Sequence, residues 1–210
     1  ANIAHGTSSV ISQTMALQLA DYVVNEAGFA SDLGCEKYMD IVMPSSGIRP
    51  SVAVLVTTVK SLRSQGEDDM TKGFANLAKH VSILQSFGLP TIVAINKFPA
   101  DTEEELKQLR AYCLQQGATC VTSEAFARGA EGAVALAEEV VRTIDGSPDV
   151  AAIGVYGPAD SAEDKIRKVA VNVYGATDVV FSEEAQRKLA RFAEWGFAEL
   201  PVCIAKTQYS

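Results

Sequence analysis

The sequence predicts an α/β fold in which a mostly parallel β-sheet carries helices on both faces. Two observations lead to this prediction. Short apolar runs alternate with segments of helical periodicity along most of the 210 residues. The apolar run at residues 92–95 also lacks the polar alternation of a half-exposed strand, as expected of a strand that is buried on both faces.

In the first half of the chain, helix and strand signals follow one another as a parallel sheet requires. Apolar residues predict a helix over residues 7–20, and a short strand is expected next, before a loop bracketed by Gly28 and Gly34. Gly88 is placed to end a later helix. The early strand is expected at residues 22–25. It is followed by a strand at 52–58, a helix at 70–87 and a strand at 92–95.

The second half begins with a helix over residues 101–116, which Asp101 or Thr102 is placed to cap. The turn-rich segment 145–148 is the best candidate for a linker. We therefore expect an α/β core segment over residues 1–146 and a smaller α/β segment over 147–210 that returns to the sheet. The other expected elements are strand 119–121, loop 123–132, helices 133–144, 162–174 and 183–195, and strand 202–205.

Composition excludes several classes of protein. A net charge of −8 argues against a nucleic-acid partner that is held through phosphates. Apolar runs are far shorter than the roughly 18 residues that span a bilayer, and the first residues do not form a secretory signal, so we expect a cytoplasmic protein without a membrane partner. Four scattered cysteines and two histidines favour neither a metal site nor a disulfide framework.

The segment that follows the apolar run at 92–95 is the most informative candidate site. Residues that follow a buried parallel strand lie at the sheet edge where α/β proteins bind ligands. Pro99 fixes its own backbone and so holds Phe98 as a rigid aromatic surface. The pair Asn96-Lys97 matches the start of a guanine-binding Asn-Lys-x-Asp motif, but Pro99 replaces its aspartate. No glycine-rich nucleotide loop occurs in the sequence.

Segments along the whole chain resemble those of the formate–tetrahydrofolate ligase family. Several of them occur in the same order, which makes the resemblance specific. They read ANIAHG at 1–6, EAGF at 26–29, DLG at 32–34, GFANL at 73–77, VAINKFP at 93–99, DTE at 101–103, LP at 200–201 and AKTQYS at 205–210.

The resemblance implies an ATP-dependent ligase that forms 10-formyltetrahydrofolate from formate, ATP and tetrahydrofolate through formyl phosphate. It implies a core like that of P-loop NTPases, which is incomplete here because the family's glycine-rich loop lies upstream of the matched region. We therefore expect an internal part of the enzyme that is inactive alone. Its implied partners are small-molecule substrates, the rest of the parent polypeptide and further copies in a tetramer. Apart from ATP with Mg and tetrahydrofolate as substrates, no tightly bound cofactor is implied.

An alternative is a stand-alone, non-catalytic α/β binding or regulatory module derived from the ligase. The two readings differ in what the parent reading frame encodes. A glycine-rich Lys-Thr/Ser loop upstream would support the ligase, and a start codon just before Ala1 would exclude it.

The resemblance also implies a folate pocket. A pterin is a flat ring that is held by stacking and by polar groups at its edge. Phe98 matches one face of the family's aromatic clamp, and Phe126 stands where the family usually has tryptophan, which predicts weaker stacking. Asn96 either bonds the pterin edge or caps its strand, and Phe29 either lines the pocket or packs in the core. The predicted folate-binding residues are Phe98, Pro99, Phe126, Phe29, Asn96 and Val121.

A second group of residues is assigned to the nucleotide and phosphate side. His5 lies in a loop that feeds a helix, where it either meets an anion or belongs to an ordinary capped start. Glu26 and Lys206 follow predicted strands, although a carboxylate such as Glu26 is often only solvated there. Ala30 replaces a glycine of the family, and an ordinary φ at this position would accommodate the change.

Overall fold

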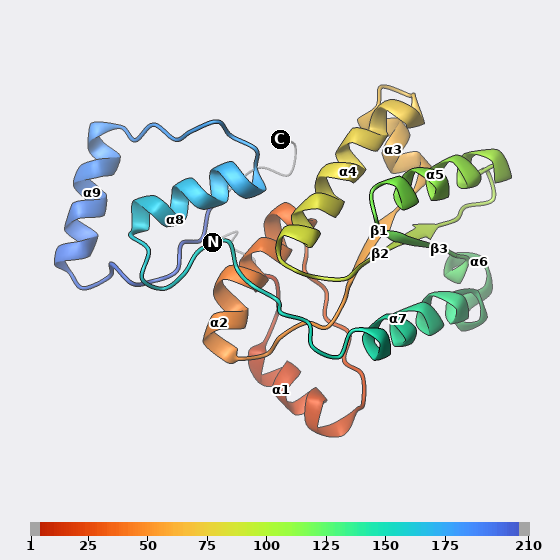
Figure 1. The fold of residues 1–210 in the computed structure, drawn as a ribbon, viewed down its shortest axis with the longest axis horizontal. Helices are drawn as coiled ribbons and strands as arrows, with labels where there is room; N and C mark the ends of the chain where they lie inside the picture. The colour runs from red at the N-terminus through yellow and green to blue at the C-terminus, as the bar shows by residue number, and fades with distance from the viewer. Residues whose placement is uncertain (1–4, 206–210) are drawn as a thin grey trace. The chain divides into compact units, whose positions relative to one another are not determined.

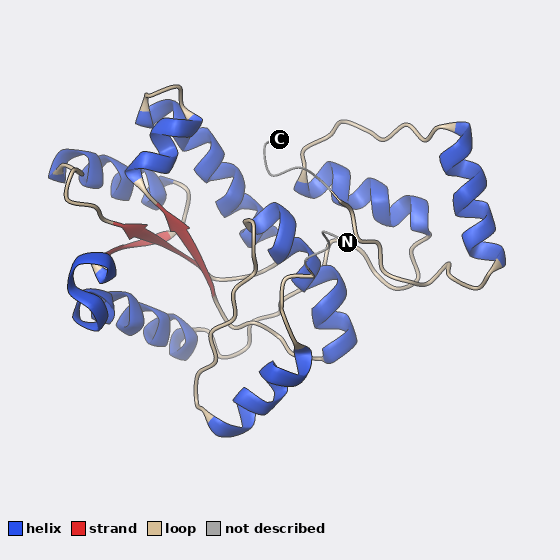
Figure 2. Ribbon diagram, turned by 180° about the vertical axis from the view of Figure 1, so that it is seen from behind, coloured by secondary structure: helices blue, strands red, loops and turns tan. Residues whose placement is uncertain are grey.

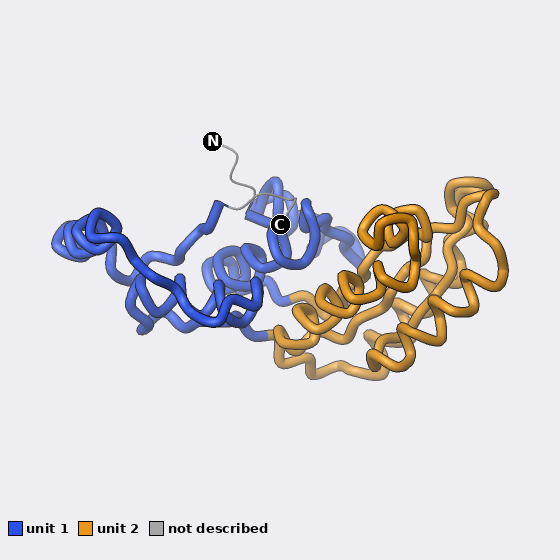
Figure 3. Tube along the Cα trace, turned by 90° about the horizontal axis from the view of Figure 1, so that it is seen from above, with its two compact units in different colours: residues 1–49, 153–210 blue, residues 50–152 orange. Residues whose placement is uncertain are grey.

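The computed structural model describes residues 5–205. Contacts within the chain group it into two compact units, coloured separately in Figure 3. Unit 2 consists of residues 50–152, and unit 1 joins residues 1–49 with residues 153–210. The division predicted after residue 146 lies close to one of these boundaries, but the grouping of the first 49 residues with the last segment has no signal in the local sequence.

Unit 2 is built on a three-stranded parallel sheet, which confirms the predicted α/β fold class (Figure 2). The strands are β1 (Ala53–Thr57), β2 (Thr91–Asn96) and β3 (Thr119–Ser123), in the order β1-β2-β3. β2 lies in the centre, and four of its residues, 92–95, are buried. Both neighbours supply backbone partners, so the continuous apolar run has the environment that its sequence predicts.

Helices cover both faces of this sheet (Figure 1). α3 (Val59–Gln65), α4 (Met70–Ser86) and α5 (Glu103–Gln115) pack on one face, and α7 (Val134–Gly146) packs on the other. The main core lies between the sheet and the first three helices. Its buried residues are Val59, Leu62, Met70, Leu77, Val81, Val93, Ile95, Leu106, Leu109, Cys113 and Ala118.

Local signals fix where the helices of unit 2 begin and end. Thr102 caps α5, because its hydroxyl accepts from the Glu105 N–H while the Glu105 carboxylate accepts from the Thr102 N–H. The predicted cap is therefore Thr102 rather than Asp101. After α4, Gly88 has a φ of 74°, a left-handed conformation that glycine adopts without strain.

Unit 1 consists of helices and extended chain. α1 (Val10–Leu19) confirms the first predicted helix, and its Ser9 cap accepts from the Ser12 N–H. A second helical stretch comprises the π-helical turns η1 (Ser31–Cys35) and η2 (Tyr38–Val42) and then α2 (Met43–Ser46). The predicted C-terminal helices are also present. They are α8 (Ala162–Lys168), continued by the π-helical turn η4 (Val169–Val173), and α9 (Glu183–Glu194).

Two predicted strands are wrong. Residues 22–25 and 202–205 form no strand within the described part of the chain. Val24 is 96% exposed, so the first segment has neither a pairing strand nor a covering layer there. The second segment is held by Tyr156, whose hydroxyl accepts from the Val202 N–H at 3.1 Å and donates to the Val202 carbonyl at 3.3 Å. The described residues after 146 thus form helices and extended chain rather than a smaller α/β lobe.

Between residues 5 and 205, none of the helices combines the length and apolar character that crossing a bilayer requires.

Candidate ligand site at the carboxyl edge of the sheet

The carboxyl ends of β2 and β3 place several predicted site residues at one edge of unit 2. Asn96, the last residue of β2, is in register with Ser123, the last residue of β3. Val121 lies opposite Ala94, two positions earlier on each strand. Because side chains alternate along a strand, Asn96 and Val121 belong to the same face of the sheet, and both are half-buried.

Phe98 sits just beyond this edge on a fixed backbone. The Lys97 N–H donates to the Ser123 carbonyl at 2.9 Å, which extends the strand pairing by one residue. The Phe98 N–H donates to Asp101 Oδ2 at 2.8 Å, and Pro99 restricts the next φ. The predicted rigidity of Phe98 therefore has a backbone cause in which Asp101 takes part. The Phe98 side chain is half-buried, and Pro99 is exposed.

Phe126 approaches Phe98 from the segment that follows β3. This segment consists of the short helix α6 (Ala125–Arg128) and the 3₁₀ turn η3 (Gly129–Ala133). The two ring centroids are 5.3 Å apart with an interplanar angle of 44°. Phe126 is 76% exposed, so one ring of the pair stands open to solvent. Two adjacent aromatic faces at a sheet edge offer a surface on which a flat ring can stack.

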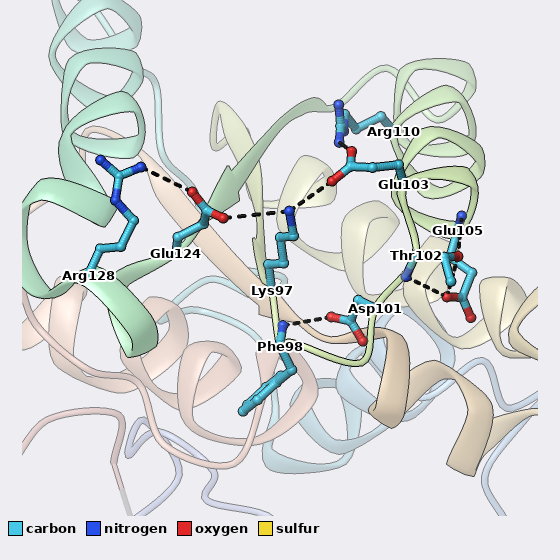
Figure 4. A network of polar contacts seen from close by, with 9 residues as sticks. All are labelled: Lys97, Phe98, Asp101, Thr102, Glu103, Glu105, Arg110, Glu124 and Arg128. Atoms are coloured by element: carbon cyan, nitrogen blue, oxygen red, sulfur yellow. Dashed lines mark hydrogen bonds and ion pairs between the residues drawn. The ribbon is translucent and has the colours of Figure 1, made fainter.

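A network of charged groups lies beside Phe98 (Figure 4). Lys97 Nζ lies 2.8 Å from Glu103 Oε1 and 3.5 Å from Glu124 Oε1. Glu103 also pairs with Arg110, and Glu124 pairs with Arg128. The hydrogen bond with Glu103 holds the pKa of Lys97 above its usual value, and the same bond holds the pKa of Glu103 below its own. Lys97 therefore links charges that come from α5 and from the start of α6.

The remaining predicted residues belong to unit 1 or lie outside the described residues. His5 and Glu26 are exposed, and Lys206 falls outside residues 5–205. Phe29 is 70% exposed, which excludes the alternative of core packing. Near His5, the Asn25 amide donates to the Gly6 carbonyl at 3.0 Å and so fastens the loop before α1.

The backbone beside Phe29 differs from the simple expectation for Ala30. Ala30 has a φ of 81° and a ψ of 177°, and Phe29 has a φ of 64°. Residues with a Cβ rarely adopt positive φ, and the region that Ala30 occupies is almost restricted to glycine. The exchange of glycine for alanine therefore falls on a position where φ is not ordinary, and the loop carries backbone strain.

Two buried carboxyl groups of unit 1 were missed by the sequence analysis. Glu36 is 0% exposed and Asp40 is 2% exposed. Asp40 Oδ1 accepts from the Val155 N–H at 2.7 Å. Burial raises the pKa of both acids, and the proximity of Asp40 raises that of Glu36 further. Their separation of four residues on a helical stretch could have indicated that they share a face.

Comparison with known proteins gives a consistent result. The sequence profile of the family described as Formate--tetrahydrofolate ligase matches residues 1–210. A curated relative from Symbiobacterium thermophilum, named Formate--tetrahydrofolate ligase, is 46% identical over 222 aligned residues. The alignment covers 100% of this chain and 40% of the relative, so the chain spans less than half the length of that protein.

Proposed function

Because the chain belongs to the formate–tetrahydrofolate ligase family, we propose that unit 2 contributes the folate-binding part of such a ligase. The whole protein would form 10-formyltetrahydrofolate from formate, ATP and tetrahydrofolate. The observation that carries the assignment to unit 2 is the ring pair Phe98–Phe126 at the carboxyl edge of the sheet. The pterin of tetrahydrofolate is a flat heterocycle that such a surface suits.

The other residues of the edge have roles that follow from their positions. Pro99 and Val121 supply apolar surface, and the amide of Asn96 can both donate to and accept from the polar edge of a pterin. The assignment of Phe29, which lies in unit 1, to folate is a proposal that rests on the family resemblance alone. None of these side chains is a nucleophile or a general base, so this set binds and orients the substrate.

The phosphate side receives fewer assignments. His5, Glu26 and Lys206 are proposed to face the nucleotide or formyl phosphate, on the basis of the resemblance. The sequence holds no glycine-rich Lys-Ser/Thr loop among these 210 residues. A tetrameric assembly and association with further polypeptide of the ligase are likewise proposals that rest on the family.

Titration of tetrahydrofolate against single variants tests the folate assignment. Stacking of a flat base on an aromatic side chain contributes about 1–3 kcal/mol by alanine substitution, so Phe98→Ala and Phe126→Ala should each weaken binding at least fivefold. Phe126→Trp should tighten binding, since the indole offers a larger face. Phe192→Ala, which removes an exposed ring of unit 1, is the matched control. Unchanged affinity in both alanine variants would remove the two rings from the pocket.

A further inference from the structure

The segment that carries Phe126 is weakly anchored. Residues 124–133, which we call the ring segment, contain no buried residue. Its internal contacts include the Glu124 N–H, which donates to the Gly132 carbonyl at 3.0 Å, and the Arg128–Glu124 ion pair. Within the described residues, two side-chain contacts tie it to the end of β2. They are the Phe98–Phe126 ring contact and the Lys97–Glu124 ion pair.

The observed ring separation is too small for a ligand that stacks between the two rings. Carbon atoms in contact lie about 3.5–4.0 Å apart, so a flat ring between two others needs a centroid separation of roughly 7 Å. The centroids of Phe98 and Phe126 are 5.3 Å apart. Since the Phe98 backbone is fixed by Asp101 and by the strand pairing, the ring that must yield is Phe126.

We propose that Lys97 is a positioning residue of this site, whose ammonium group keeps the ring segment near β2, so that Phe126 has to move only from a centroid separation of 5.3 Å to roughly 7 Å when a flat ring enters. The inference rests on the proposed function, because it takes the pterin to enter between the two rings. Lys97 is suited to this role because it contacts carboxylates from two elements. It is anchored to Glu103 on α5 at 2.8 Å, and its contact with Glu124 is longer, at 3.5 Å.

The surroundings of Lys97 give this ion pair more effect than a fully exposed one. The side chains of Lys97 and Glu124 are 26% and 38% exposed, so water and salt screen their attraction only in part. Without the pair, the exposed Phe126 ring can leave Phe98, and binding must then order the segment again. That ordering costs affinity even though Lys97 itself need not touch the ligand.

The first test needs no ligand. Phe126→Trp combined with Trp195→Phe places the chain's one tryptophan in the ring segment, because the sequence has only one to remove. On this background, Lys97→Met keeps the apolar stem and removes the charge. It should raise acrylamide quenching of the tryptophan as the ring leaves Phe98, by no more than about one third because the ring at 126 is already 76% exposed, and Lys97→Arg should restore the original value. Lys188→Met is the matched control, since it removes a lysine charge that pairs with Glu184 in unit 1 and should leave the quenching unchanged.

The second test uses tetrahydrofolate itself. Because ion pairs near the surface contribute little, the loss of tetrahydrofolate affinity in Lys97→Met should be at most about fivefold. In a double-mutant cycle, adding Glu124→Gln to Lys97→Met should cause little further loss, because both changes break one contact. Higher salt should weaken binding by the original chain and leave Lys97→Met almost unaffected.

The two tests separate this inference from the proposed function. Quenching that is equal in Lys97→Met and the original chain would overturn the positioning role, as would additive losses in the cycle. If instead Lys97→Met frees the ring but Phe98→Ala and Phe126→Ala bind tetrahydrofolate normally, the folate assignment fails, and with it the role of Lys97 in that site.

Discussion

Replacing Ala30 by glycine should stabilise this protein, which is the reverse of what glycine usually does. Ala30 precedes η1 with a φ of 81° and a ψ of 177°. A residue with a Cβ in such a region costs about 1–3 kcal/mol. Glycine relieves this cost but adds about 0.4–1 kcal/mol of unfolded-state entropy. The difference leaves a net stabilisation of up to about 2.6 kcal/mol for Ala30→Gly, and about 1.3 kcal/mol at the midpoints of the two ranges.

Equilibrium urea unfolding and thermal melting are the assays. For a chain of this length, each kcal/mol moves the melting temperature by about 2–4 °C. The matched control is Ala20→Gly, because Ala20 is also exposed and next to a helix but has an extended backbone with a φ of −142°. This control should be less stable than the original chain, as should Ala30→Val. If Ala30→Gly lowers the midpoint as much as Ala20→Gly does, the strain argument is refuted.

Two further substitutions test the buried groups of each unit. Burial raises the pKa of Glu36 to about 8 in the folded protein, whereas the pKa of an unfolded glutamate is near 4.3. Between these two values the folded state binds more protons than the unfolded state. The free energy of unfolding therefore falls as pH rises through this window. Glu36→Gln stays neutral beside Asp40 and should flatten the decline of the urea midpoint between pH 5 and 8; an unchanged slope would contradict this. In unit 2, a Cβ at Gly73 would lie 2.0 Å from the Leu62 carbonyl oxygen, so Gly73→Ala should lower the free energy of unfolding by about 1–3 kcal/mol. The control is Gly146→Ala, whose added Cβ meets nothing within 4 Å and should not destabilise the protein. Equal melting temperatures for these two variants would show that α3 and α4 can part without cost.

Unit 2 could be predicted well because its signals are local. The apolar run at 92–95, the Thr102 cap and the left-handed Gly88 each depend on neighbouring residues, and the structure confirms them. The strands expected at 22–25 and 202–205 show the limit of such reasoning. A short apolar run forms a strand only if another strand pairs with it, and that partner is not encoded within the run itself.

The candidate site shows the same division between local and distant information. The position of Phe98 at a sheet edge follows from the strand before it and from Pro99. Its neighbour Phe126 lies 28 positions later and was identified only through the family resemblance. The Lys97–Glu124 pair had no signal at all, because acids and bases are common on helix surfaces and their pairing depends on how β2 and β3 are placed.

The two rings of the proposed folate site differ in how their backbones are held, and we expect them to have separate tasks. The backbone of Phe98 is held by Pro99, by the hydrogen bond to Asp101 and by the pairing of Lys97 with Ser123. Its ring is therefore in position before any ligand binds. Phe126 is carried by a segment without buried residues, so its ring can adapt to what lies on that plane. Because a preorganised surface loses less entropy on binding than a mobile one, truncation of Phe98 should raise the dissociation constant of tetrahydrofolate more than truncation of Phe126 does. A larger loss in Phe126→Ala would instead place the fixed half of the clamp on the ring segment.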